Sequence, residues 1–270
     1  MEINKIYCAE NVSFLKTMED NFIDLTVTSP PYDNLRDYNE YTFDFEGIAK
    51  ELYRVTKQGG IVVWVVGDAT VKGSETGTSF RQALYFKEIG FNLHDTMIYY
   101  RTSPFPQSNR YWQSFEYMFV FSKGCPNTFN PVKVNKTKYN NTKSFRKKDG
   151  TIEKVSEKAL ERLSLASSGE LKDAENIWYI PAGYGISTAD KIAFKHPAIF
   201  PEKLAENHIL SWSNEGDLVL DPFAGSGTTC KMAMLNNRNY IGIEISEEYC
   251  QIAEERLSNS LKKQEESLWK

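Results

Sequence analysis

The chain has 270 residues, of which 41% are hydrophobic and 25% are charged, and its formal net charge is −4. This composition is ordinary for a globular protein, and the length suits one large α/β domain or a domain with an insertion. The longest apolar run, IVVWVV, is too short to cross a bilayer, and no leader peptide is evident, so we expect a cytoplasmic protein without membrane association.

Apolar strands and amphipathic helices alternate along most of the chain. The predicted strands cover 22–29, 59–68, 94–101, 116–123, 217–222 and 239–246. The predicted helices, recognised by the helical spacing of their apolar residues, cover 45–60, 79–90, 200–213 and 246–264. This alternation predicts an α/β fold with a mostly parallel sheet and helices on both faces. The strands at 94–101 and 116–123 are predicted to form an antiparallel pair at one edge.

The first predicted strand ends in the sequence Ser-Pro-Pro-Tyr, formed by Ser29, Pro30, Pro31 and Tyr32. Two consecutive prolines remove two backbone donors and fix two φ angles. The motif therefore predicts a stiff shelf with a hydroxyl before it and an aromatic ring after it. The alternative interpretation is a simple strand end followed by a packed tyrosine, and these four residues alone do not decide between the two.

The alternating pattern stops between residue 125 and about residue 190. The segment from Lys133 to Lys158 carries nine basic and three acidic side chains, a local charge of +6 that leaves −10 on the remainder. A basic patch on an acidic body is the expected footprint of phosphate binding, although a solvated lysine-rich loop would give the same count. The candidate phosphate-binding residues are Lys133, Lys136, Lys138, Lys143, Arg146, Lys147 and Lys148.

The clearest local motif is the sequence DLVLDPFAGSGTTC, which predicts a strand, a loop and the start of a helix. Asp221 ends the strand, and Gly225 and Gly227 allow a tight turn and the close approach of a ligand. The helix that starts at Thr228 directs its N-terminus toward that ligand. Glu244 ends the next strand, 23 residues after Asp221, where a carboxylate can accept two hydrogen bonds from a ribose diol. The motif therefore predicts a ligand that contains an adenosine-like ribose.

A nicotinamide dinucleotide is one candidate for this ligand. Its fingerprint requires a third glycine, which would fall at Cys230. The loop sequence instead resembles the S-adenosylmethionine loop of DNA amino-methyltransferases. Together with Ser-Pro-Pro-Tyr, it makes most of the chain resemble the DNA methyltransferases that act on exocyclic amines. The motif order, with the shelf first, the insertion next and the glycine loop last, resembles the circularly permuted β-type of that family.

The resemblance implies a Rossmann-like methyltransferase fold with three parts. Residues 1–124 would form the catalytic part, 125–190 a target-recognition insertion, and 191–270 the cofactor-binding part of the same domain. It implies S-adenosyl-L-methionine as the cofactor. The residues that it assigns to the cofactor are Glu10, His196, Phe200, Pro201, Asp221, Phe223, Gly225, Gly227, Thr228 and Glu244.

The same resemblance assigns the chemistry to the shelf. An exocyclic amine is a poor nucleophile, and Ser29 Oγ and the Pro30 carbonyl would accept its two N–H groups so that the lone pair faces the methyl group. Tyr32 would stack on the base, which must first flip out of the duplex. The transfer would be a direct in-line displacement governed by positioning. Methylation at the ring carbon of cytosine would resemble a different class, with a cysteine after a proline, and here Cys125 instead precedes Pro126.

The base that is methylated and the binding partners are predicted from the resemblance alone. Serine at the first position of the tetrapeptide favours the N(4) amine of cytosine in duplex DNA, and N(6)-adenine methylation is the alternative. A nicotinamide-dependent oxidoreductase, an RNA methyltransferase and a catalytically silent DNA-binding regulator are further alternatives. The expected partners are double-stranded DNA and a possible cognate restriction endonuclease, with the chain a monomer or homodimer. The four cysteines lack metal-ligand spacing, so we expect no metal site.

Overall fold

The computed structural model describes residues 1–31, 43–101, 108–135, 144–154, 156 and 171–268. The chain forms two compact units. The first contains Met1–Asn130 together with Asn176–Lys270, and the second contains Pro131–Glu175. The boundaries of the second unit lie inside the predicted insertion, because residues 176–190 belong to the first unit.

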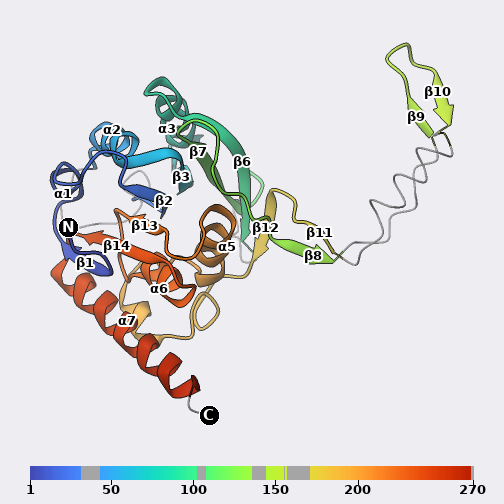
Figure 1. Ribbon diagram of the computed structural model, residues 1–270. Coiled ribbons are helices and arrows are strands. Elements are labelled where there is room, and N and C mark those ends of the chain that lie inside the picture. Colours follow the sequence, from blue (N-terminus) through green and yellow to red (C-terminus); the bar gives the residue numbers. More distant parts are fainter. Residues whose placement is uncertain (32–42, 102–107, 136–143, 155, 157–170, 269–270) are drawn as a thin grey trace. The chain divides into compact units, whose positions relative to one another are not determined.

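The first unit is built on an eight-stranded sheet of order β1-β14-β13-β2-β3-β7-β6-β12 (Figure 1). In that order the strands are Lys5–Cys8, Asn239–Glu244, Leu218–Asp221, Ile23–Thr28, Thr56–Val66, Phe115–Ser122, Asn92–Arg101 and Ile177–Ile180. All pairings are parallel except those of β7, which runs antiparallel to both β3 and β6. The mostly parallel α/β fold is thereby confirmed.

The strand at one edge of the sheet is not the one that the sequence predicts. Strands β6 and β7 form the expected antiparallel pair, but β12 adds to β6 in parallel and forms the edge instead. Strand β12 has only four residues and lies in the segment that was assigned to the insertion. Because its sequence, IWYI, follows a long polar stretch, no periodic pattern marks it as part of the sheet.

The helices cover both faces of the sheet, as Figure 1 shows. Helix α2 (Phe45–Val55) contacts both α1 (Asn11–Leu15) and α3 (Thr78–Glu88) on one face. Helices α5 (Glu202–Trp212), α6 (Thr228–Leu235) and α7 (Glu247–Leu268) contact one another on the other face. The short 3-10 helix Lys191–Lys195 packs against α7. None of the described helices is long and apolar enough to cross a membrane.

An apolar core lies between the sheet and the layer that contains α2 and α3. Trp64 on β3 and Phe86 on α3 are fully buried, with ring centroids 5.2 Å apart. Phe86 also stacks on Phe121 of β7 at 4.5 Å, and the Trp64 indole donates a hydrogen bond of 2.9 Å to Gln82. Because the central strands are covered on both faces, they form continuous apolar runs.

The second unit contains two small antiparallel pairs. Strand β8 (Lys133–Asn135) pairs with β11 (Leu171–Asp173), and β9 (Ser144–Arg146) pairs with β10 (Ile152–Lys154). A further two-stranded hairpin in the first unit joins β4 (Thr70–Val71) and β5 (Ser74–Glu75).

Candidate active site

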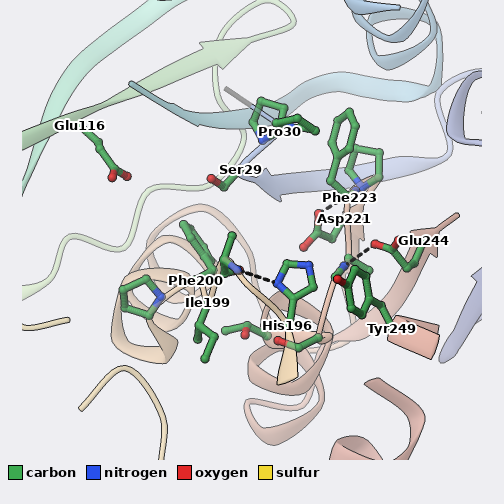
Figure 2. A pocket seen from close by; sticks show the side chains of 18 of the residues that line it. Ser29, Pro30, Glu116, His196, Ile199, Phe200, Asp221, Phe223, Glu244 and Tyr249 are labelled. Atoms are coloured by element: carbon green, nitrogen blue, oxygen red, sulfur yellow. Dashed lines mark hydrogen bonds between the residues drawn. The ribbon is translucent and has the colours of Figure 1, made fainter. Parts of the chain in front are cut away.

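The carboxyl ends of the parallel strands at the centre of the sheet lie side by side, because parallel strands run in the same direction. Asp221 is the last residue of β13, Glu244 is the last residue of β14, and Ser29 directly follows β2. These residues, which are far apart in the sequence, line one cavity of about 370 Å³. This volume lies in the range of small-molecule sites. In the view of Figure 2, Ser29 lies between Glu116 on one side and Glu244 on the other.

The loop after β13 strongly favours glycine at two positions. Gly225 and Gly227 have φ angles of 50° and 76°, in the left-handed region that other residues rarely adopt. A Cβ atom on Gly225 would lie 3.0 Å from the His196 ring, and one on Gly227 would lie 2.8 Å from Ala253 Cβ. The second glycine therefore also permits the close packing of α7 beneath the loop.

Glu244 is held by backbone amides at the end of β14. Its Oε2 accepts a hydrogen bond of 2.9 Å from the Gly225 N–H, and its Oε1 accepts one of 2.9 Å from the Ser246 N–H. Burial raises the pKa of this carboxyl, while the amide hydrogen bonds oppose the shift. Each carboxylate oxygen retains acceptor capacity, so the side chain is suited to a pair of hydroxyl groups.

Asp221 is the second acidic group of the cavity. Its Oδ1 accepts hydrogen bonds from the Thr28 hydroxyl at 2.7 Å and from the Phe223 N–H at 3.1 Å. Burial raises its pKa to about 6, and the nearby Glu244 carboxylate adds to the effect. The Thr28 partner was not predicted from the sequence, because it comes from β2 rather than from the glycine loop.

The segment before α5 forms another wall of the cavity. The Ala198 N–H donates to His196 Nδ1 at 3.1 Å, and the His196 ring contacts Tyr249 with centroids 4.4 Å apart. Phe200 and Pro201 also line the cavity. In the view of Figure 2, Phe200 and His196 lie below Ser29 and Asp221.

A buried network of charged side chains on α5, α6 and α7 contacts the glycine loop. The fully buried Arg256 of α7 donates to the Ser226 carbonyl at 2.6 Å and to Glu202 Oε1 at 2.8 Å. Lys231 of α6 contacts both Glu202 and Asp190 at 2.6 Å. The network therefore ties the loop to the N-terminus of α5. The sequence alone does not reveal this network, because basic and acidic residues on separate helices carry no local signal.

The shelf and the ends of β6 and β7 complete the cavity. Ser29, Pro30 and Pro31 line it, and Tyr32 lies outside the described residues. The cavity is also lined by five residues in or near these strand ends that no sequence motif marks: Tyr99, Arg101, Gln113, Phe115 and Glu116.

The comparisons with known proteins fit this geometry. A protein-family model described as DNA methylase, N6_N4_Mtase, matches residues 23–255. The chain belongs to this DNA methylase family. The predicted membership in the DNA amino-methyltransferases is thereby confirmed.

Individual relatives cover nearly the whole chain. It is 65% identical over 246 residues to the orphan methyltransferase M.BamHII of Bacillus amyloliquefaciens, which covers 89% of this chain and 90% of that protein. It is 29% identical over 265 residues to the type II methyltransferase M.BglII of Bacillus subtilis, with 95% of this chain and 69% of that protein covered.

Two solved structures show the same fold. The PvuII DNA methyltransferase (cytosine-N4-specific) matches with a TM-score of 0.65 and 23% identity over 94% of this chain and 90% of that one. A putative DNA modification methylase from Thermus thermophilus, TTHA0409, solved in complex with S-adenosyl-L-methionine, matches with a TM-score of 0.63 and 23% identity. That match covers 95% of this chain and 93% of the other.

Most of the predicted site residues of this DNA methylase meet in the cavity. Those that line it are Ser29, Pro30, Pro31, His196, Phe200, Pro201, Asp221, Phe223, Gly225, Thr228 and Glu244. Gly227 shapes the loop without lining the cavity. Glu10 caps α1 instead, with its carboxylate accepting from the Val12 and Ser13 amides at 3.0 and 2.7 Å. A cofactor contact by Glu10 therefore stays a prediction.

The basic residues of the insertion are only partly described. Lys133 pairs with Asp173, and Lys147 contacts Glu153 at 2.7 Å. Lys148 is exposed. The positions of Lys136, Lys138 and Lys143 and the side chain of Arg146 lie outside the described part of the second unit. Within the described residues, no group of histidine, cysteine and acidic side chains could hold a metal ion.

Proposed function

We propose that this DNA methylase transfers a methyl group from S-adenosyl-L-methionine to the N(4) amine of cytosine in duplex DNA. The observation that carries the proposal is the meeting of two motifs in one cavity. The glycine loop with Asp221 and Glu244 lines one part, and the shelf formed by Ser29 and Pro30 lines the next.

The cofactor half of the cavity fits S-adenosyl-L-methionine. The buried carboxylate of Asp221 and the half-buried carboxylate of Glu244 have raised pKa values, so a cation beside them would relieve an electrostatic cost. The cofactor carries a sulfonium and an ammonium group, and when bound it supplies an electrophilic methyl group. Glu244 would accept the ribose hydroxyls, while Phe223 and Phe200 would cover apolar parts. The anionic pyrophosphate of a dinucleotide would instead face these carboxylates, which disfavours the oxidoreductase alternative.

The shelf would prepare the target amine. The Ser29 hydroxyl and the Pro30 carbonyl are acceptors that follow β2 directly, and the ring of Pro31 fixes φ after them. Acceptors held in this way would take both N–H groups of an exocyclic amine and turn its lone pair toward the methyl donor. Because the geometry is fixed before the reaction, the contribution of the shelf is mainly one of orientation. Tyr32 would stack on the base.

Two observations favour the N(4) amine of cytosine. Ser29 occupies the position at which serine usually accompanies cytosine in the family that the sequence resembles. A structural neighbour is named as cytosine-N4-specific. Adenine at N(6) remains the second candidate. Ring-carbon methylation is disfavoured, because none of the four free cysteines, all within the described residues, lines the cavity. The glycine loop and the shelf both keep the residues that the reaction needs, which disfavours a DNA-binding regulator without catalytic activity.

We extend this proposal to the role of the enzyme in the cell. Residues of the second unit, with their lysines, would contact DNA phosphates and read the target sequence. The enzyme would act in the cytoplasm as a monomer or homodimer of the circularly permuted β-type. Several relatives are named type II methyltransferases, which supports a role beside a restriction endonuclease. A relative that is 65% identical is named an orphan methyltransferase. This name instead supports an enzyme that has no paired restriction endonuclease.

The experiment is incubation of the wild type and of Ser29→Ala with labelled S-adenosyl-L-methionine and unmethylated DNA, followed by mass spectrometry of the nucleosides. We expect N(4)-methylcytosine from the wild type. Ser29→Ala should lower turnover more than DNA affinity, because its hydrogen bond matters most in the transition state. DNA binding without any methylated nucleoside would favour the silent regulator.

A further inference from the structure

One wall of the cavity contains a buried hydroxyl without a protein partner. Tyr99 lies on β6, lines the cavity and is only 2% exposed. Its hydroxyl has no hydrogen-bond partner among the residues that the structure describes. Burial raises the pKa of Tyr99 to about 12, so the hydroxyl stays protonated at neutral pH and can donate.

A second donor lies on the same strand. Arg101 also lines the cavity, and its Nη1 lies 3.3 Å from Glu116 Oε1. Its Nη2 donates to the Gln113 carbonyl at 3.3 Å, but its Nε is buried without a partner in the described part of the chain. Glu116 is the residue of β7 that pairs directly with Tyr99 across the strands. Tyr99 and Arg101 therefore place two unused donors on one wall, with a carboxylate that holds the guanidinium.

Buried donors of this kind call for an explanation. The large majority of buried polar groups in folded proteins have a partner, and a missing partner destabilises the fold. A ligand that supplies the missing acceptor removes this destabilisation when it binds, so unpaired buried donors are expected at binding sites. In the view of Figure 2, Glu116, which contacts Arg101 and is the strand partner of Tyr99, lies on the side of Ser29 away from Glu244.

We propose that Tyr99 and Arg101 donate hydrogen bonds to the acceptor edge of the flipped cytosine, the ring nitrogen N3 and the carbonyl oxygen O2. The inference rests on the proposed function, because it assumes that the shelf holds the N(4) amine. With the amine fixed at Ser29, the two acceptors of cytosine follow along the same edge of the ring. Glu116 acts as a positioning residue that orients Arg101.

This arrangement discriminates between the two candidate bases. Adenine has an acceptor, N1, beside its amine, but it has a C2–H group where cytosine has O2. One of the two donors would then remain buried without a partner. A site that must leave a buried polar group unpaired rejects the wrong substrate strongly. Tyr99 and Arg101 are thus specificity-determining residues for the same transfer.

The test uses Tyr99→Phe, which removes only the hydroxyl. We expect its unfolding temperature to be unchanged or higher, because an unpartnered buried group is lost. We expect kcat/KM on unmethylated plasmid DNA to fall about 10-fold, the scale of one buried hydrogen bond, with unchanged S-adenosyl-L-methionine affinity in calorimetry. Thr26→Val is the matched control: it removes another buried, unpartnered hydroxyl, outside the cavity, and should leave kcat/KM unchanged.

Each other result overturns the inference. An unchanged kcat/KM means that the base does not use the hydroxyl. A parallel loss of cofactor affinity places Tyr99 in the cofactor half, and a lower unfolding temperature shows a structural role. In the double variant Tyr99→Phe/Arg101→Lys, which keeps a charge beside Glu116, the ratio of methylated cytosine to methylated adenine should fall. If the wild type methylates only adenine, the proposed function fails separately, whatever the variants show.

Discussion

Asp221 offers a direct test of the electrostatics of the cavity. Burial raises its pKa from the ordinary 3.8 to about 6, so between these values the folded state binds more protons than the unfolded state. Stability must therefore fall as the pH rises through this window. A difference of about two pH units, at 1.36 kcal/mol each, corresponds to about 3 kcal/mol of destabilisation at pH 7.

The perturbation is Asp221→Asn, which keeps the shape of the side chain and removes its charge. The amide oxygen can still accept from the Thr28 hydroxyl and from the Phe223 N–H, which now contact Oδ1. We expect the free energy of unfolding at pH 7 to rise by up to about 3 kcal/mol. The gain should shrink to less than about 1 kcal/mol near pH 4, where the folded-state carboxyl is protonated and the unfolded-state carboxyl is only partly ionised. The affinity for S-adenosyl-L-methionine should fall, because the anion beside the cation is lost.

Urea denaturation at pH 4, 5.5 and 7 measures the stability, and calorimetry measures the cofactor affinity. The matched control is Thr28→Val, which leaves Asp221 charged but removes one of its donors. This control should destabilise the protein more at pH 7 than at pH 4, opposite to the effect of Asp221→Asn. The reasoning is refuted if Asp221→Asn is less stable than the wild type by the same amount at every pH.

Three further results are expected. Glu244→Ala should weaken S-adenosyl-L-methionine binding by about 2–3 kcal/mol at most, and equal affinities in calorimetry would remove Glu244 from the site. Arg256→Met removes one of the two buried cations that pair with Asp190 and Glu202, while Lys231 still contacts both acids, and should cost up to about 3–5 kcal/mol in urea denaturation; a loss below about 1 kcal/mol would show that Arg256 is not needed in the network under the loop. Replacing Lys147 and Lys148 by alanine should reduce the salt slope of DNA binding by about 0.9 per lost phosphate contact, and an unchanged slope would mean that neither lysine touches a phosphate.

The sequence predicts correctly that the residues of the glycine loop meet at one cavity, because they lie at fixed places in a strand-loop-helix-strand unit. Asp221 and Glu244 end adjacent parallel strands, and Gly225 must adopt a positive φ angle between them. Such positions follow from local chemistry and from the rule that parallel strands end at one edge. The shelf at Ser29 follows for the same reason.

The partners of these residues could not be predicted, since they come from distant parts of the chain. Thr28 is 193 residues from the Asp221 carboxylate that it contacts. Tyr99 lies on β6, whose sequence contains no motif that marks a binding residue. Glu10 illustrates a position with two interpretations. An acid after a strand suits a cofactor contact, which stays a prediction, and it also suits the N-terminus of the short helix α1, which its carboxylate caps.

The central claim is that the shelf presents an exocyclic amine of cytosine to the methyl donor. Its most direct test is mass spectrometry of nucleosides from duplex DNA that carries nitrogen-15 only in the N(4) amine of cytosine, after reaction with a labelled methyl donor. The account predicts a methylated deoxycytidine in which the methyl group is bonded to the heavy nitrogen. Methyl groups found only on adenine would contradict the target base, and methyl groups on the ring carbon of cytosine would contradict the mechanism as a whole.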